Sequence, residues 1–222
     1  MGNGDGDRRR GLLVALEGGE AVGKSTQATA LAARLGAVVT REPGGTALGQ
    51  ALRGLLLEAG LRSLDPRAET LLVLADRAAH MAEVVRPALE AGRTVVTDRF
   101  SGSTLAYQGF GRGLDREDLR QLCDWATGGW WPDLSVLLDA DPVLTASRRH
   151  VPGDRIEAAG LAFHRRVREG YLELATADPT HWLVVDAGGP PEEVERSIAT
   201  AVEDWLATRA TVALAQPSRD PG

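Results

Sequence analysis

The stretch Gly18-Gly19-Glu20-Ala21-Val22-Gly23-Lys24-Ser25 decides the fold class of this chain. It matches the Walker A pattern, in which glycines let backbone N–H groups turn onto phosphate oxygens. The helix expected to start near Lys24 adds the positive end of its dipole to the same place. The pattern also predicts that Lys24 binds the β- and γ-phosphates and that the Ser25 hydroxyl ligates Mg²⁺. The alternative interpretation is a chance glycine-rich turn.

The segments around this loop predict an α/β fold of the P-loop NTPase type. Short apolar runs are expected to form strands at residues 12–16, 37–40, 94–97, 134–138 and 182–185. Helical spacing of apolar residues predicts helices at 24–35, 46–57, 66–90, 116–126, 161–176 and 191–208. Strands that alternate with helices predict a parallel sheet covered on both faces, with ligands beyond the carboxyl ends of its strands.

Length and composition indicate one ordinary globular domain. The 222 residues, 43% hydrophobic and 25% charged, suit a single domain at 11–208 between a flexible tail at 1–10 and a disordered tail at 209–222. The net charge of -6 argues against nucleic acid as a partner, because phosphate backbones require clustered cations. We find no signal peptide and no apolar run near the roughly 18 residues of a membrane span, so no membrane partner is expected.

Cysteine and histidine usage narrows the chemistry further. The single cysteine, Cys123, excludes a disulfide framework within the chain and favours a reducing, cytoplasmic location. We interpret Cys123 as a small buried apolar residue, with a catalytic role as the alternative. The histidines show no metal-ligand spacing and are expected at surface or structural positions.

Three further segments carry a family resemblance. They are Thr40-Arg41-Glu42-Pro43-Gly44-Gly45-Thr46, then Asp98-Arg99-Phe100 with Ser103-Thr104 and Ala106-Tyr107-Gln108, then Pro132-Asp133-Leu134. Together with Glu17-Gly18 and the phosphate loop, they resemble the signature segments of bacterial thymidylate kinases from about Leu12 to Trp205. The resemblance implies a nucleoside-monophosphate kinase architecture with a five-stranded parallel sheet flanked by helices, a lid over the ATP phosphates and usually a homodimer. The implied reaction is the ATP-dependent phosphorylation of dTMP to dTDP, with Mg²⁺ as cofactor.

The resemblance also implies a role for each matching residue. Asp98 resembles the family's acid near Mg²⁺ and the phosphates, Arg99 the arginine that clamps the acceptor phosphate, and Arg53 a second phosphate arginine. The expected catalytic residues are Lys24, Asp98, Arg99 and Arg155, and the expected metal ligands are Ser25 and Asp98. The expected ATP-binding residues are Gly18, Gly19, Glu20, Ala21, Val22, Gly23, Lys24, Ser25, Thr26, Arg148 and Arg149. The expected acceptor-binding residues are Glu20, Arg41, Arg53, Val73, Arg77, Arg99, Ser103, Thr104, Tyr107 and Gln108.

Several of these roles make physical sense without the resemblance. An arginine fork matches a phosphate's oxygens in pairs, and an aspartate after a buried strand is a usual place for a Mg²⁺-organising carboxylate. Asp139 also follows an apolar run, but Asp98 is preferred because Arg99 adjoins it. A surface turn is the alternative for the Asp98-Arg99 pair. Glu20 faces the phosphates and is interpreted as the acid that binds the acceptor's sugar, with a solvated loop acid as the alternative.

A basic segment, residues 148–157, is expected within a lid at about 141–157. A cationic loop there would close over ATP and stabilise the charge on the transferring phosphoryl group. The family places an arginine either in the phosphate loop or in the lid. This phosphate loop has Ala21 and Val22 and no arginine, and Asp154-Arg155-Ile156-Glu157 resembles the lid arrangement. A solvated loop is the alternative.

The sequence departs from the family pattern at Val73. That pattern usually has an aromatic residue four positions before the substrate arginine, where it stacks on thymine, and a valine cannot stack in that way. A kinase for another nucleotide or a nucleoside is therefore one alternative function, and a nucleotide-binding protein without turnover is another. Trp130-Trp131 is expected in the core or at a dimer surface.

Overall fold

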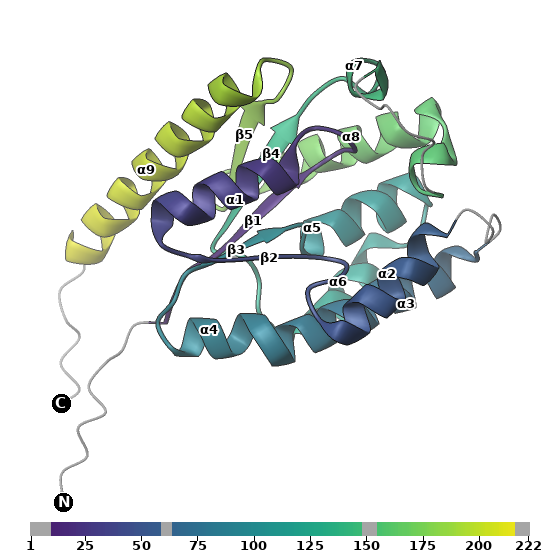
Figure 1. Ribbon diagram of the computed structural model, residues 1–222, viewed down its shortest axis with the longest axis horizontal. Helices are drawn as coiled ribbons and strands as arrows, with labels where there is room; N and C mark the ends of the chain where they lie inside the picture. The colour runs from purple at the N-terminus through teal and green to yellow at the C-terminus, as the bar shows by residue number, and fades with distance from the viewer. Residues whose placement is uncertain (1–9, 59–63, 148–154, 216–222) are drawn as a thin grey trace, which may run out of the picture.

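The computed structural model describes residues 10–58, 64–147 and 155–215 (Figure 1). Its centre is a five-stranded sheet in the order β2-β3-β1-β4-β5, with every neighbouring pair parallel. The strands are β1 (Leu13–Gly18), β2 (Val38–Arg41), β3 (Val95–Asp98), β4 (Leu134–Asp139) and β5 (Trp182–Asp186). All five lie within two residues of their predicted ends, so the predicted parallel sheet is confirmed.

The two faces of β1 pack against different layers of helices, as its alternating side chains require. Val14 and Leu16 lie in a core with α1 (Lys24–Leu35) and α9 (Pro191–Ala215). Leu13 and Ala15 lie in a core with the helix that contains residues 81–90. On the β4 side of that second face, α8 (Leu161–Ala177) packs against residues 105–111. The sheet is therefore sandwiched between helices, as in Figure 1.

The long helix predicted at 66–90 is present and contains a π-helical turn. It comprises α3 (Pro66–His80), η1 (Met81–Val85) and α4 (Arg86–Glu90). Asp65 caps its start by accepting from the backbone N–H groups of Arg67 and Ala68. The widened turn lies just before Pro87, whose missing N–H and bulky ring disturb the preceding hydrogen bonds.

A helical segment at 101–111 was not expected from the sequence. It consists of α5 (Ser101–Thr104) and η2 (Leu105–Gly111). Three glycines and several hydroxyl residues give this segment poor helix propensity, and burial of its side chains overrides that propensity. The remaining helices are α2 (Ala47–Leu57), α6 (Arg116–Thr127), α7 (Pro142–Ser147) and η3 (Glu157–Ala159).

The last helix is longer than predicted, since α9 continues to Ala215 instead of ending at 208. Nη2 of Arg209 lies 3.2 Å from Oδ1 of Asp133, and its guanidinium covers the Trp205 ring. The same aspartate also binds Arg10, which lies close to β1, at 2.8 Å. These contacts anchor residues that the sequence had assigned to tails, whereas residues 1–9 and 216–222 lie outside the described part.

Trp130 and Trp131 both pack against the core. Trp130 lies beside the cluster that contains Leu13, and Trp131 lies beside the cluster of α3 and α6. Across the described ranges, no helix has both the length and the apolar content that crossing a membrane would require.

Candidate active site

The carboxyl ends of β1, β2 and β3 bring together three segments far apart in the sequence. The phosphate loop follows β1, the turn that starts at Glu42 follows β2, and Asp98-Arg99 ends β3. The turn is joined to β3 by a backbone hydrogen bond of 2.9 Å from the N–H of Glu42 to the carbonyl of Asp98. Candidate site residues thus meet at the sheet edge where such folds bind ligands.

The phosphate loop has the backbone geometry of an anion-binding turn. Gly18 and Gly23 have φ angles of 139° and 89°, and Ala21 has a φ of 57°. A side chain at Gly18 would also collide with the carbonyl of Leu138. Helix α1 starts at Lys24, whose Nζ donates to the carbonyl of Gly19. Burial, helped by the charge of Arg99, lowers the pKa of Lys24 to about 8.

Ser25 and Asp98 lie in contact, as a shared metal site would need. Oγ of Ser25 donates to Oδ2 of Asp98 at 2.5 Å, and Oδ1 of Asp98 is buried without a hydrogen-bond partner in the described structure. The competing acid, Asp139, instead binds Arg168 through both oxygens at 2.7 and 2.8 Å. The geometry therefore favours Asp98 as the acid beside the phosphate loop.

No group of three or more histidine, cysteine, aspartate or glutamate side chains able to hold a metal occurs within the described ranges. One carboxylate and one hydroxyl fit Mg²⁺ nonetheless, because that ion usually keeps several waters and takes phosphate oxygens as ligands. The unpartnered Oδ1 of Asp98 supplies the anionic oxygen for such a site.

Arg99, Glu20 and Tyr107 form a tight cluster at the border of two cavities. Nη2 of Arg99 and the hydroxyl of Tyr107 each donate to Oε1 of Glu20 at 2.6 Å. The Arg99 guanidinium also lies over the Tyr107 ring, 4.9 Å from its centre. Although burial alone would raise it, Arg99 and Lys24 lower the pKa of Glu20 to about 2, so this acid is ionised.

The first cavity, of about 280 Å³, surrounds the phosphate loop. Beyond the loop, its lining includes Thr26, Arg41, Arg53, Asp98 and Arg99, so most of the expected phosphate-binding groups face one space. Arg41 lines this cavity and not the second one, where it was expected as an acceptor residue. A concentration of arginines around a helix N-terminus suits a polyphosphate.

The second cavity, of about 110 Å³, adjoins the first. Nine of the ten expected acceptor residues line it: Glu20, Arg53, Val73, Arg77, Arg99, Ser103, Thr104, Tyr107 and Gln108. The sequence analysis missed Glu42, Pro43, Leu56, Leu57, Glu69 and Ile156, which also line it. Glu42 and Pro43 lie inside a quoted motif, which is the one signal that could have identified them. Glu69 lies within an ordinary helical pattern, which gives no sign that it lines a binding cavity.

Behind this cavity, Ser103 is fixed by a buried acid. Its Oγ donates to Oε2 of Glu17 at 2.6 Å, and the backbone N–H groups of Phe100 and Ser103 donate to Oε1. Burial raises the pKa of Glu17. Glu17 thus supports the chain between Arg99 and Thr104 from behind.

The structure does not bring Arg155 to the phosphate loop. Its guanidinium donates to Oε2 of Glu69 at 2.6 Å and to the carbonyl of Leu56 at 3.0 Å, beside the second cavity. Glu69 is fully buried and also accepts from Gln108 at 2.8 Å and from Arg112. This difference arises because an acid far away in the sequence offers Arg155 a charge partner. Arg148 and Arg149 lie outside the described residues.

Comparisons with known proteins agree on one family. The family model for thymidylate kinase matches residues 16–198. The chain is 50% identical over 203 residues to a thymidylate kinase of Deinococcus radiodurans, covering 88% of this chain and 98% of the relative. It is 48% identical over 205 residues to one of Nitratidesulfovibrio vulgaris, covering 86% and 92%. A crystal structure of thymidylate kinase from Ehrlichia chaffeensis superposes with a TM-score of 0.73 at 29% identity, covering 87% of this chain and 99% of that one.

Proposed function

The chain belongs to the thymidylate kinase family, and we propose that it transfers the γ-phosphoryl group of ATP directly onto the phosphate of dTMP, with Mg²⁺ as cofactor. One observation carries the mechanism. The phosphate-loop cavity and the second cavity share Glu20, Glu42, Arg53 and Arg99 in their linings. Two polyanionic substrates in these cavities would meet at the two shared arginines, as an in-line transfer requires.

The transfer needs charge neutralisation more than proton transfer. The phosphate of dTMP is largely a dianion at neutral pH, since its second pKa is about 6, so one of its oxygens attacks without a strong general base. A new bond forms between that oxygen and the γ-phosphorus, the bond to the β-phosphate oxygen breaks, and ADP and dTDP leave. Lys24, Arg53 and Arg99 stabilise the charge that spreads over the transferring group.

Ser25 and Asp98 are the residues that would hold Mg²⁺. Bound there, the ion would supply positive charge that neutralises the phosphates. The fit of the site to the ion is supported by the buried, unpartnered Oδ1 of Asp98 beside the Ser25 hydroxyl. Here the protein supplies one acid at the end of β3 and one hydroxyl in the first turn of α1.

The acceptor nucleoside would occupy the second cavity. Arg77, Thr104 and Gln108 offer polar groups to the edge of a pyrimidine, while Val73 and Ile156 offer apolar contact to its faces. We assign Arg155 to this acceptor side, where it fixes Glu69 and, through it, Gln108. This assignment replaces a direct contact between Arg155 and ATP.

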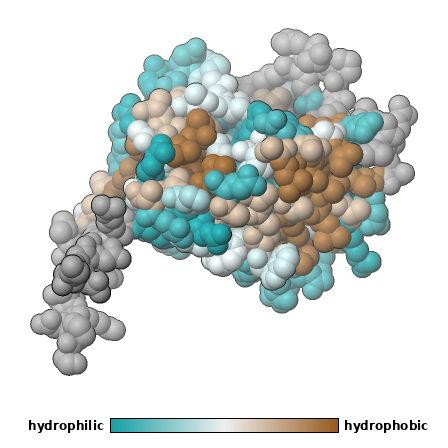
Figure 2. Space-filling model, turned by 60° about the horizontal axis from the view of Figure 1, so that its bottom comes forward, coloured by the Kyte–Doolittle hydropathy of each residue, from teal (hydrophilic) through white to brown (hydrophobic). Residues whose placement is uncertain are grey.

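We also propose that the protein works as a homodimer in the cytoplasm. Apolar side chains on α2, α3 and α6 are exposed, namely Leu48, Leu55, Leu71, Leu122 and Trp125, and Trp125 is 82% exposed. Figure 2 displays a broad hydrophobic patch on the side of the molecule where α2 and α3 lie. A patch of this kind suits a second copy of the chain. Sedimentation equilibrium at micromolar protein tests this, and a monomer at that concentration contradicts it.

A coupled assay of ADP release over a panel of nucleosides and nucleoside monophosphates tests the function. We expect the highest kcat/KM with dTMP and no turnover by Lys24→Ala, which removes the phosphate-loop charge. A higher kcat/KM with another acceptor would identify a different kinase. ATP binding without ADP release for every acceptor would identify a non-catalytic protein.

A further inference from the structure

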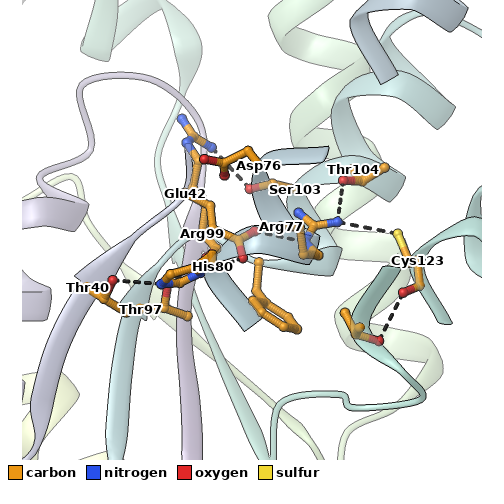
Figure 3. A network of polar contacts seen from close by, with 12 residues as sticks. Thr40, Glu42, Asp76, Arg77, His80, Thr97, Arg99, Ser103, Thr104 and Cys123 are labelled. Carbon is orange, nitrogen blue, oxygen red and sulfur yellow. Dashed lines mark hydrogen bonds and ion pairs between the residues drawn. The ribbon is translucent and has the colours of Figure 1, made fainter. Parts of the chain in front are cut away.

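A chain of buried polar side chains starts in the wall of the acceptor cavity, which Glu42 and Arg77 line, and continues behind it to His80 and Thr40 (Figure 3). Oγ1 of Thr40 lies 2.7 Å from Nε2 of His80, and Nδ1 of His80 lies 2.8 Å from Oε1 of Glu42. The other oxygen of Glu42 accepts from Nε of Arg77 at 2.8 Å. Glu42, Arg77 and His80 are only 3%, 1% and 0% exposed, so water competes little for these bonds.

The chain ends on an arginine that is held from several sides. Nη1 of Arg77 donates to Oγ1 of Thr104 at 2.8 Å and to Sγ of Cys123 at 3.4 Å. The face of its guanidinium lies over Phe100, 5.3 Å from the ring centre. No residue in the described ranges accepts a hydrogen bond from Nη2, and Arg77 lines the acceptor cavity. Nη2 is therefore the nitrogen left for the acceptor's base.

Glu42 joins the arginine to the rest of the site because its two oxygens serve two residues of one helix face. Arg77 and His80 lie three positions apart on α3, so both side chains reach the same loop. That loop approaches His80 so closely that a Cβ on Gly45 would lie 2.6 Å from Cδ2 of the imidazole. The carbonyl of Pro43 in the same loop accepts from Nη1 of Arg53, a proposed phosphate ligand, at 3.0 Å.

The negative charge on Glu42 determines which atoms donate hydrogen bonds in this chain of side chains. Although burial alone would raise it, Arg77 and the His80 hydrogen bond hold the pKa of Glu42 below its ordinary value. A carboxylate only accepts hydrogen bonds, so Nδ1 of His80 carries the proton in their bond. His80 in turn donates to the second oxygen of Glu42, and this bond keeps the carboxylate from rotating away from Arg77.

We propose that Glu42 and His80 are positioning residues for base recognition: Glu42 fixes the guanidinium of Arg77, and His80 fixes Glu42. This inference rests on the proposed function and adds a specificity device that begins with Glu42 and Arg77 in the cavity wall and continues to His80 behind it. A rigid Nη2 donor facing the base favours a carbonyl oxygen and disfavours an amino group. Thymine carries O4 where cytosine carries an amino group, so the device selects dTMP over dCMP.

The test compares kcat/KM for dTMP and dCMP across matched variants. His80→Phe keeps a buried ring but loses both hydrogen bonds. His80→Asn keeps a donor near the position of Nδ1, and Glu42→Gln removes the charge. We expect His80→Phe and Glu42→Gln to raise the KM for dTMP about tenfold and to lower the dTMP-to-dCMP ratio to a similar extent. The KM for ATP should stay within about twofold, and His80→Asn should recover most of the ratio.

Leu89→Ala is the control for lost stability. Leu89 is fully buried in the core, nine positions after His80 on the same long helix, and its apolar side chain makes none of the hydrogen bonds of the polar chain. Its replacement should lower the melting temperature without changing the dTMP-to-dCMP ratio. If His80→Phe does not fold, Glu42→Gln carries the same comparison.

The results that would overturn this positioning role differ from those that would overturn the proposed function. An unchanged acceptor ratio in His80→Phe and Glu42→Gln, with an active wild-type enzyme, overturns the positioning role. An equal fall of kcat for both acceptors, matched by Leu89→Ala, also overturns it, because that result reports only lost stability. A wild-type enzyme without dTMP kinase activity overturns the proposed function instead.

Discussion

Nη2 of Arg99 lies 2.6 Å from Oε1 of Glu20, at the border between the two cavities. The arginine adopts a φ of 73°, in the left-handed region, and its Nη1 donates to the carbonyl of Gly18 at 3.0 Å. Its side chain is thus aimed between the two phosphate sites by a backbone conformation that L-residues rarely adopt. Backbone strain of this kind is typical of functional sites, where a side chain must keep one direction.

Two substitutions at Arg99 should therefore distinguish the catalytic effect of its guanidinium from the strain of its backbone conformation. Arg99→Ala and Arg99→Gly both remove the guanidinium, and we expect each to lower kcat by about 10²–10³-fold or more. Arg99→Gly should be more stable than Arg99→Ala by about 1 kcal/mol, because glycine adopts positive φ without penalty. Steady-state kinetics and urea unfolding measure the two effects. Near-normal kcat in either variant would remove Arg99 from the mechanism.

Affinity for ATP should fall as the pH rises through about 8, the value to which burial lowers the pKa of Lys24. Above that pH the free enzyme loses the proton, and binding of the polyanion must restore it. The dissociation constant should then rise by up to about tenfold per pH unit. Calorimetry in buffers of different ionisation enthalpy should detect proton uptake above pH 8. Lys24→Arg is the control, since arginine stays charged, and an equal pH dependence in it would contradict the prediction.

Val73→Phe should lower the KM for dTMP by roughly threefold to tenfold, because aromatic stacking contributes about 0.5–1.5 kcal/mol beyond area burial. Val73 lines the acceptor cavity. Neither Phe100 nor Phe110 lines it, since Phe100 packs under Arg77 and Phe110 packs under Arg116. Val73→Leu is the matched control, which adds size without a ring. Equal KM values for the two variants would show that stacking is not the cause.

Arg155→Ala should raise the KM for dTMP by about tenfold and leave the KM for ATP nearly unchanged. A tenfold rise corresponds to about 1.4 kcal/mol, within the range of a charge-assisted hydrogen bond. The physical reason is that Arg155 donates to Glu69, which also holds Gln108 in the cavity wall. Arg112→Ala removes a more exposed partner of Glu69 and is the control, which should have a smaller effect because water competes more for its bonds. A fall of kcat without a change in dTMP KM would favour a direct role in the lid.

Asp76→Asn should change the pH dependence of stability. Burial, helped by the charge of Glu42 and opposed by the Gly44 N–H bond, raises the pKa of Asp76 to about 6. Because this lies above the value in the unfolded chain, ionisation of Asp76 destabilises the fold as the pH rises from about 4 to about 7. The free energy of unfolding of Asp76→Asn relative to wild type should therefore increase over that range, by at most about 3 kcal/mol.

Urea unfolding at several pH values measures this difference. Oδ1 of Asp76 accepts from the N–H of Gly44 at 2.9 Å in the wild type, and the amide oxygen in the Asp76→Asn variant can accept the same bond. Asp204→Asn, at an exposed position on α9, is the control and should follow the wild type at every pH. A constant difference between Asp76→Asn and wild type would show that Asp76 is not a buried, strained acid.

Much of the molecule follows from the sequence because its signals are local. Each strand is a short apolar run whose ends are marked by glycine or a charged residue, and the phosphate loop is a contiguous run with a fixed turn. The parallel order then places the ends of β1, β2 and β3 together. Local signals therefore predicted the sheet, the phosphate loop and Asp98 as the acid beside it, and the family resemblance supplied most of the other residues that line the two cavities.

The tertiary structure decided which distant charges pair and which weak helices form. Arg77 and Glu42 are 35 positions apart and Arg155 and Glu69 are 86 apart, and no local pattern selects one acid among many for a given arginine. Residues 101–111 become helical because burial of their side chains outweighs their poor local propensity, and the ion pair of Arg209 with Asp133 anchors α9 beyond its predicted end. Such partnerships depend on the distances and the desolvation that the folded chain creates, and the sequence alone does not contain them.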